Sequence, residues 1–174
     1  MTGTDSLFGR VRLGYVLVES RRRDAWQRFA TEGLGLHAEP VASGALALRV
    51  DERERRLIIR PGPAEDVVAL GVTTSFPYSA AHPSALGWEF DDAAALEAAL
   101  ARLRGVGVGL APIGGADAEL RGIRAGWQCR GPKDTPLELF TAADAKAATA
   151  PLCMRVSAFV TGALGLGHLA ITTR

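Results

Sequence analysis

The sequence predicts an α+β fold built from two similar units, each a strand followed by a helix and then by two or three short strands. The main sign is internal repetition, because Leu-Gly-Tyr at 13–15, Leu-Gly-Trp at 86–88 and Leu-Gly-His at 166–168 each open an extended apolar stretch. The first two stretches are each followed by a segment with helical periodicity. With 174 residues, 48% of them hydrophobic, the chain is long enough for one domain or slightly more, with a real core.

The first unit starts with the strand LGYVLVE and continues into the helical segment RRRDAWQRFATEGLGL. Four residues of this segment share one helical face: Trp26, Phe29, Ala30 and Gly33. Trp26 and Phe29 could line a ligand pocket, but their helical spacing favours a place in the core. Ser20 is the expected N-cap of this helix, and Gly33 and Gly35 are expected to end it.

The second unit repeats this order, with the strand LGWEF followed by the helical segment DDAAALEAALARLRGVGV. Asp91 or Asp92 is the expected N-cap, and Gly105 is expected to end the helix. The apolar face is formed by leucines three or four residues apart: Leu96, Leu100 and Leu103.

Short strands follow each helix. In the first unit, strands at 45–50 and 56–60 flank the charged turn DERER, as in a hairpin. In the second, strands at 124–130 and 137–141 flank the turn GPKDTP. The charged run at 51–56 is expected to be a solvated face. Neither unit could bury its sheet face alone, whereas two packed together could.

The remaining segments are predicted to connect or extend these units. Residues 71–84 contain two prolines and lack periodicity, which indicates an inserted surface loop. Residues 142–157 are alanine-rich and are interpreted as a linker, and the strand LGHLAITT within 158–174 is interpreted as the start of a third unit.

Composition excludes several classes of protein. The net charge is +1, without the basic stripe typical of nucleic-acid-binding proteins, so no nucleic-acid partner is expected. The start MTGTDSLFGR does not resemble a signal peptide, and glycines interrupt the uncharged stretch 156–173, so no membrane span is expected. Cys129 and Cys153 are expected to be free thiols in a reducing cytoplasm, although one bridge between them is conceivable.

Five segments in this order make the chain resemble the N-terminal part of a type I extradiol ring-cleavage dioxygenase: LGYVLVES, DAWQRFATEGLGL, LGWEFDDAAALEAALARL, PLELF and FVTGALGLGHLAI. These dihydroxybiphenyl and catechol dioxygenases belong to the vicinal oxygen chelate superfamily, with glyoxalase I and the bleomycin-resistance proteins. The resemblance implies paired βαβββ modules at about 8–70 and 85–141, which form one domain over 1–141. It also implies an extra C-terminal strand that begins a third, incomplete module.

The resemblance also implies where a metal would bind. In this family the second module pair holds Fe(II), occasionally Mn(II), through two histidines and a glutamate, and the first histidine lies in the GLGH strand, at His168 here. The other two ligands are expected beyond Arg174. A facial triad leaves positions open for a catecholate and dioxygen, whereas one histidine cannot hold iron usefully. His168 is therefore the single candidate ligand, or, judged alone, a histidine satisfied by a backbone carbonyl. This chain alone is expected to bind no cofactor, and no catalytic or substrate-binding residue is assigned.

In the first module pair, the positions equivalent to the ligands are Tyr15, Trp88 and Glu138. Because an indole cannot ligate a metal, this pair is interpreted as metal-free. Glu138 is expected to be capped or paired with an arginine rather than kept as a ligand.

Two hypotheses about function remain open. In the first, the chain is the non-catalytic N-terminal domain of an Fe(II)-dependent dioxygenase that cleaves catechol-type aromatics with O2, completed by further sequence or a partner chain. In the second, it is a stand-alone binding protein for a small apolar ligand, like the bleomycin-resistance proteins. Either hypothesis allows a small aromatic molecule as partner, and an unpaired terminal strand or module pairing favours a homo-oligomer.

Overall fold

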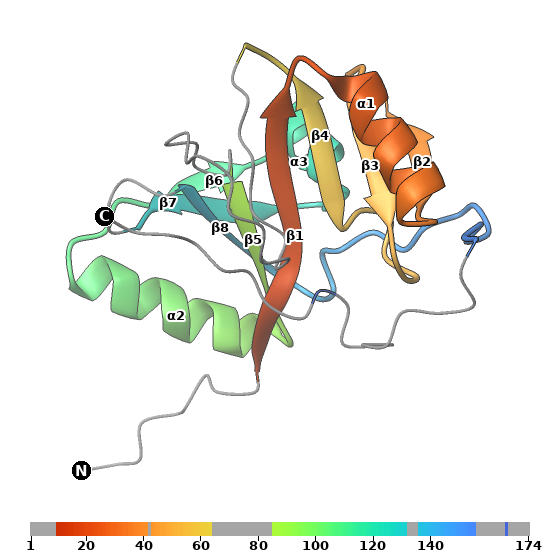
Figure 1. The fold of residues 1–174 in the computed structure, drawn as a ribbon. Helices are drawn as coiled ribbons and strands as arrows, with labels where there is room; N and C mark the ends of the chain where they lie inside the picture. The colour runs from red at the N-terminus through yellow and green to blue at the C-terminus, as the bar shows by residue number, and fades with distance from the viewer. Residues whose placement is uncertain (1–9, 42, 64–84, 132–135, 156–165, 167–174) are drawn as a thin grey trace, which may run out of the picture.

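A computed structural model describes residues 10–41, 43–63, 85–131, 136–155 and 166 (Figure 1). Eight strands form one mixed sheet in the order β2-β3-β4-β1-β5-β8-β7-β6. The strands are β1 (Val11–Ser20), β2 (His37–Pro40), β3 (Leu46–Arg49), β4 (Leu57–Pro61), β5 (Ala85–Phe90), β6 (Ala111–Ile113), β7 (Gly126–Arg130) and β8 (Pro136–Thr141). The helical elements are α1 (Arg23–Arg28), the π-helical turn η1 (Phe29–Gly33), α2 (Ala93–Gly105) and α3 (Gly115–Arg121).

The two halves of the sheet repeat one connectivity. In the first half, β1 pairs in parallel with β4, with Val16 opposite Leu57. In the second half, β5 pairs in parallel with β8, with Leu86 opposite Leu137. The halves join where β1 and β5 run antiparallel at the centre of the sheet. The α+β fold with a duplicated strand–helix–three-strand unit is thereby confirmed.

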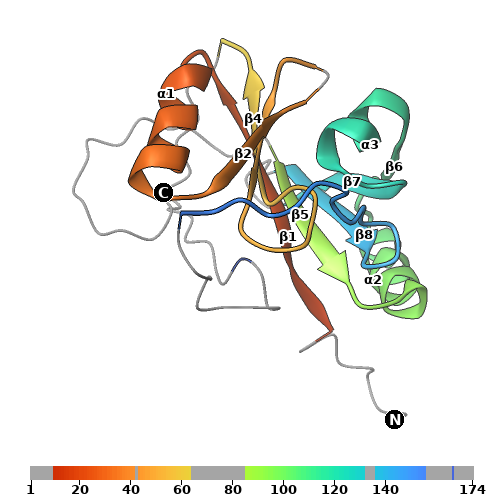
Figure 2. The same cartoon turned by 90° about the vertical axis from the view of Figure 1, so that its right-hand side faces the viewer.

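The helices divide between the two faces of the sheet (Figure 2). On the outer face, α1 packs on the first half through Trp26, and α2 packs on the second half through Leu96 and Leu100. The inner face is covered by α3, which contributes Ala118 and Leu120 to a cluster with side chains of the central strands. From Tyr15 onward, alternation along β1 divides its apolar residues between these faces, with Tyr15 and Leu17 inward and Val16 and Val18 outward. The register shifts between Leu13 and Tyr15, so Leu13 also faces outward.

Two expectations for the first helix were wrong. The N-cap is Arg22 rather than Ser20, and the Ser20 hydroxyl instead accepts a hydrogen bond of 3.0 Å from the Arg22 amide, so it shapes the turn before the helix. Phe29 is 53% exposed rather than buried in the core. The regular helix ends after six residues and widens into the π-helical turn, which keeps Ala30 buried and leaves the Phe29 ring edge-on to Trp26 at the surface.

The second helix follows the prediction closely. Asp92 is its N-cap, and its Oδ1 accepts a 2.8 Å hydrogen bond from the Ala95 amide. Gly105 is its last residue. Three elements were not individually predicted, namely β2, β6 and α3, because each is short and its residues lack a periodic apolar pattern.

Two of the predicted segments lie outside the described residues. The loop at 71–84 lies outside them, as does the strand within 158–174, apart from Leu166, which packs against the outer-face cluster beside α1.

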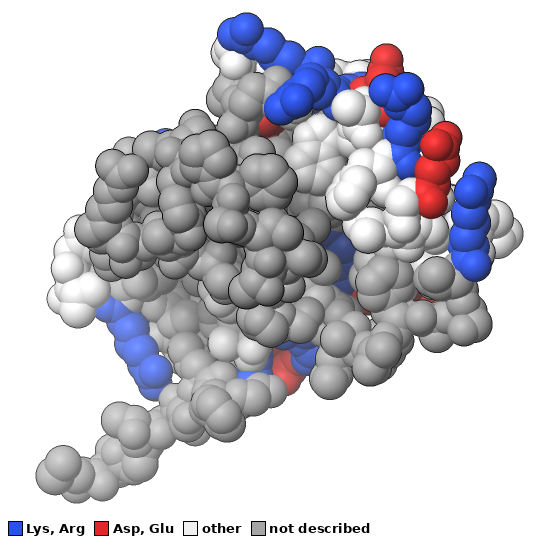
Figure 3. All heavy atoms as spheres, in the orientation of Figure 1, with Lys and Arg blue, Asp and Glu red and all other residues white. Residues whose placement is uncertain are grey.

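Cys129 is buried, Cys153 is exposed, and both are free, as expected. Of the helices described, none is long and apolar enough to cross a bilayer. In the view of Figure 3, the visible Lys and Arg side chains are interspersed with acidic and uncharged ones.

Candidate functional site

The inner face of the sheet holds a buried cluster of Tyr15, Arg121 and Glu138, here called the Glu138 cluster. Arg121 donates from Nε and Nη2 to the two carboxylate oxygens of Glu138, each over 2.6 Å, and the Tyr15 hydroxyl donates to the same carboxylate. The side chains of Arg121 and Glu138 are 8% and 3% exposed. Such a two-point, charge-assisted contact is the strongest kind of polar pairing available to a carboxylate.

Short local features place these three groups together. Arg121 is the last residue of α3, which Gly122 ends in the left-handed conformation at φ 65°. Its Nη1 also donates to the Asp117 carbonyl one turn earlier, over 2.9 Å, which fixes the side chain along the helix. Glu138 points inward from β8, and Tyr15 reaches it from β1 across Gly87 of β5. A Cβ atom at Gly87 would lie 2.5 Å from Cζ of Tyr15, so glycine is required under the ring.

Burial and charge determine the protonation of the Glu138 cluster. Burial, followed by the negative charge of Glu138, raises the pKa of Tyr15 well above its ordinary value, so the phenol remains a hydrogen-bond donor. Burial alone would lower the pKa of Arg121, but its hydrogen bonds with Glu138 and the charge of that carboxylate raise it on balance. Beside Glu138, the cluster therefore holds a fixed cation at Arg121 and a neutral phenol at Tyr15.

The raised pKa of Tyr15 predicts a specific loss of stability in alkali. The folded state keeps the phenolic proton to a higher pH than the unfolded chain, whose tyrosines ionise near pH ~10. The contribution of Tyr15 is therefore complete below that pH and is lost as the pH rises further, by at most about 1.4 kcal/mol per pH unit. Denaturant unfolding from pH 7 to 11 should show the stability advantage of the native chain over Tyr15→Phe shrinking only above pH ~10. A constant advantage across that range would contradict the prediction.

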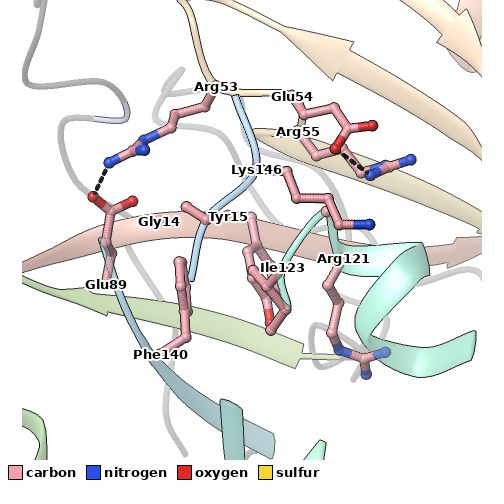
Figure 4. Close-up of a pocket in the computed structure, with 12 residues that line it drawn as sticks. Gly14, Tyr15, Arg53, Glu54, Arg55, Glu89, Arg121, Ile123, Phe140 and Lys146 are labelled. Atoms are coloured by element: carbon pink, nitrogen blue, oxygen red, sulfur yellow. Dashed lines mark hydrogen bonds and ion pairs between the residues drawn. The ribbon is translucent and has the colours of Figure 1, made fainter. Parts of the chain in front are cut away.

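A second buried charge cluster, here called the Glu89 cluster, lies beside the first (Figure 4). Glu89 of β5 is 1% exposed and accepts a 2.6 Å hydrogen bond from Arg53. Arg56 is 4.0 Å from the same carboxylate, and it binds Asp51 through Nε and Nη2 and the Gly14 carbonyl through Nη1. The expectation that the charged run 51–56 is solvated was therefore wrong for its end, where Arg55 and Arg56 are buried.

The structure brings together two of the three expected ligand positions. Tyr15 and Glu138 are in direct contact, and Glu138 is paired with an arginine, as expected. Trp88 lies elsewhere, on the outer face against the α2 cluster, because strand alternation turns Gly87 and Glu89 inward instead. Among the described residues, no group of three or more His, Cys, Asp or Glu side chains could hold a metal ion. His168 lies outside these residues.

A strap formed by residues 142–150 closes the inner face over both clusters. Its Ala145 forms a β-bridge with Ile123 of the second half, and its Ala147 forms one with Arg53 of the first half. The Lys146 amide donates to the Gly122 carbonyl over 2.8 Å, and the Lys146 carbonyl accepts from Glu54. The space left under the strap is about 10 Å³, roughly one water molecule. The strap therefore leaves no room there for a substrate.

A larger cavity of about 640 Å³ lies at the other side of the Glu138 cluster. It is bounded by α3, β6, β7 and β8, with Arg60 of β4 at its margin. Arg121 and Glu138 form part of its wall, so the buried pair is shared between the cluster and the cavity. Of the two spaces beside the Glu138 cluster, this cavity is the one large enough for a small molecule.

Sequence reasoning missed Arg121, Arg56 and Glu89 as members of the inner face. One signal was available for Glu89, because a carboxylate in the apolar strand LGWEF needs a partner when that strand is buried. The arginines carried no such signal, since guanidinium groups in charged or helical segments are usually solvated. Their positions depend on which strands lie beside each other.

Comparisons with known proteins agree with this geometry. Residues 13–62 match the family described as dihydroxybiphenyl dioxygenase BphC D1. The chain is 31% identical over 159 residues to a biphenyl-2,3-diol 1,2-dioxygenase of Pseudomonas sp. (strain KKS102), covering 90% of this chain and 48% of that protein. It is 28% identical to a 3-methylcatechol 2,3-dioxygenase of Pseudomonas putida, covering 92% of this chain and 50% of that protein. The chain thus spans about half the length of the curated relatives it matches.

Solved structures show the same fold. The crystal structure of BphC, a halotolerant catechol dioxygenase, superposes with a TM-score of 0.66 at 17% identity, over 82% of this chain and 42% of that one. A 2,2',3-trihydroxybiphenyl 1,2-dioxygenase from Sphingomonas wittichii strain RW1 superposes with a TM-score of 0.62 at 19% identity, over 82% and 43%. The fold is therefore the vicinal oxygen chelate fold of these structures.

Proposed function

The chain is similar in sequence and fold to the N-terminal part of an extradiol dioxygenase, and from this premise we propose that it forms the non-catalytic first module pair of such an enzyme. The whole enzyme would use Fe(II) and O2 to cleave catechol-type aromatic diols. In this proposal iron binds in a second module pair, where it would hold the diol and dioxygen together for reaction. The first pair would supply a rigid scaffold.

One observation supports the scaffold role. The Arg121 guanidinium donates hydrogen bonds to both carboxylate oxygens of Glu138, which is one of the positions equivalent to a metal ligand. Arg121 and Tyr15 both donate hydrogen bonds to the Glu138 carboxylate, and Trp88 lies on the opposite face of the sheet. A divalent cation needs several converging donors, and a neighbouring guanidinium repels it. The inner-face residues that the structure describes therefore do not fit a metal ion, and we assign them no catalytic step.

The proposal assigns His168 a role in the second pair, as the first of three iron ligands. Its support is the GLGH sequence at 165–168 and the similarity to relatives twice as long. A neutral imidazole offered from a strand is a suitable Fe(II) ligand, but two more ligands are required.

The test is a chimera in which residues 1–174 are followed by the remaining part of the biphenyl-2,3-diol 1,2-dioxygenase of strain KKS102. After anaerobic loading with Fe(II), the chimera is expected to convert 2,3-dihydroxybiphenyl into the yellow ring-cleavage product. His168→Ala is expected to abolish both this conversion and stoichiometric iron binding, whereas His37→Ala, a matched control, should retain both.

The isolated chain is expected to retain no stoichiometric iron and to form no product. Robust ring cleavage by the isolated chain would overturn the scaffold role. Full activity and iron content in the His168→Ala chimera would overturn the ligand assignment.

An alternative function is favoured by the cavity of about 640 Å³, which lies in the usual size range of ligand pockets. In this alternative the chain is a stand-alone binding protein for a small molecule and carries out no metal chemistry. A location in the cytoplasm and self-association through the terminal strand or module pairing are further parts of the proposal, and neither distinguishes the two functions.

A further inference from the structure

The chain leaves the strap along the edge of the first unit, where residues 151–155, here called the latch segment, lie beside β2 (Figure 1). Two hydrogen bonds attach the latch segment to this edge. The Cys153 amide donates to Nδ1 of His37 over 3.0 Å, and the Arg155 amide donates to the Gly35 carbonyl over 2.9 Å. One of the two acceptors is therefore a titratable imidazole.

The hydrogen bond from Cys153 determines which nitrogen of His37 carries the proton. A ring nitrogen that accepts from an amide has no proton of its own, so the proton of the neutral ring is on Nε2. Nε2 lies 3.3 Å from the Glu39 carboxylate and can donate to it. A second proton, on Nδ1, would set two N–H groups against each other and break the contact with Cys153. The His37 side chain is 12% exposed, so a charged ring would also be poorly solvated there.

The charged groups around His37 act in opposite directions. Arg49 lies directly opposite His37 in β3 and is wholly buried, and its Nε and Nη2 have no hydrogen-bond partner among the described residues. Its Nη1 donates to a carbonyl of the strap over 3.0 Å, which fixes this cation beside the imidazole. The Arg49 charge disfavours a second cation at His37, whereas the partly exposed Glu39 carboxylate favours one. Glu32, the titratable residue of η1, and Arg155 of the latch segment are exposed.

We propose that the latch segment is a pH-sensitive contact, held by neutral His37 and released when His37 takes up a second proton. Histidine is suited to such a switch, because imidazoles ordinarily titrate between about pH 5 and 8. The released state binds a proton that the held state excludes, so acid favours release. The latch segment connects the strap with the GLGH sequence at 165–168, so its release frees that connection from the edge of the first unit. This inference goes beyond the proposed role in ring cleavage and does not depend on iron.

The experiment measures the hydrogen-exchange protection of single amides in the iron-free chain at pH ~7.5 and pH ~5.5, after division by the intrinsic exchange rates. The protection factors of Cys153 and Arg155 are expected to fall together by about tenfold, because each pH unit on the acid side of the transition favours release by up to that factor. The Ala148 amide is an internal control. It donates to the Glu52 carbonyl, which does not titrate, and its protection should change less than about twofold.

The variant His37→Asn tests whether the imidazole is responsible. The asparagine side-chain oxygen can accept the Cys153 amide but does not titrate, so the protection should differ less than about twofold between the two pH values. The matched control is Glu32→Gln, which removes a titratable group from an exposed position on the neighbouring turn. This control should keep the fall of about tenfold.

Three results would overturn the proposal: equal protection of Cys153 at both pH values in the native chain, an undiminished fall in His37→Asn, or a fall confined to Cys153. The Arg155 amide identifies the last case, because its acceptor is the Gly35 carbonyl, which does not titrate. If His37→Asn does not fold, the comparison of Arg155 with Ala148 in the native chain still decides the question. Because the chain is measured without iron, a failure here is distinguishable from a failure of the ring-cleavage proposal.

Discussion

Replacing Arg121 by methionine is expected to lower the free energy of unfolding by about 3 to 5 kcal/mol, because it leaves the Glu138 carboxylate buried without a cation. The side chains of this pair are 8% and 3% exposed, so water cannot compensate the loss. The Tyr15 hydroxyl would remain as a single neutral donor to a full negative charge. Urea unfolding of the native chain and of the variant measures the difference.

Matched variants show whether the loss comes from the charge. Arg121→Met/Glu138→Met/Tyr15→Phe removes all three polar groups and is expected to recover most of the stability, since an apolar replacement of similar volume can equal a buried ion pair. Arg10→Met, which breaks the exposed pair with Asp92, should cost about 1 kcal/mol or less. If Arg121→Met loses less than about 1 kcal/mol, the pairing of Arg121 with Glu138 does not stabilise the Glu138 cluster.

Replacing Arg56 by methionine is expected to have an effect of similar size, about 3 kcal/mol or more. Its side chain is 3% exposed and donates to Asp51 and to the Gly14 carbonyl, and it is the second cation near Glu89. The variant would leave a buried carbonyl and two carboxylates with fewer donors, and each unmet group adds to the cost.

Arg56→Lys tests whether geometry or charge matters. Lysine keeps the charge but cannot contact Asp51 and Gly14 with one rigid fork, so about half of the loss is expected to remain. Thermal and denaturant unfolding of the two variants, beside the native chain, give the comparison. If Arg56→Met unfolds as the native chain does, the Glu89 cluster is stabilised by Arg53 and packing instead.

Both predictions concern side chains at the junction of the two units. Glu89 belongs to the second unit, while Arg53 and Arg56 belong to the first. Tyr15 of the first unit likewise donates to Glu138 of the second. The strap adds backbone contacts to each unit. Buried charge pairs and the strap thus occupy the region between the units.

Much of the fold could be predicted from local patterns. The repeated Leu-Gly openings marked β1 and β5. For α2, the leucine spacing, the two candidate N-caps Asp91 and Asp92, and Gly105 at its end predicted the bounds to within one residue. These features depend on residues within a few positions of each other, which a sequence displays directly. The first helix was predicted less well, because the π-helical turn at Phe29–Gly33 changes which side chains face the sheet.

The sequence alone determined the duplicated α+β architecture, the resemblance to extradiol dioxygenases and the expectation that Glu138 pairs with an arginine. Only the tertiary structure decided which arginine this is, that Trp88 points away from the inner face, and that the end of the charged run at 51–56 is buried. The physical reason is that such contacts are set by strand register between distant segments. Tyr15 and Glu138 lie 123 positions apart, and they meet only because β1, β5 and β8 are neighbours in one sheet.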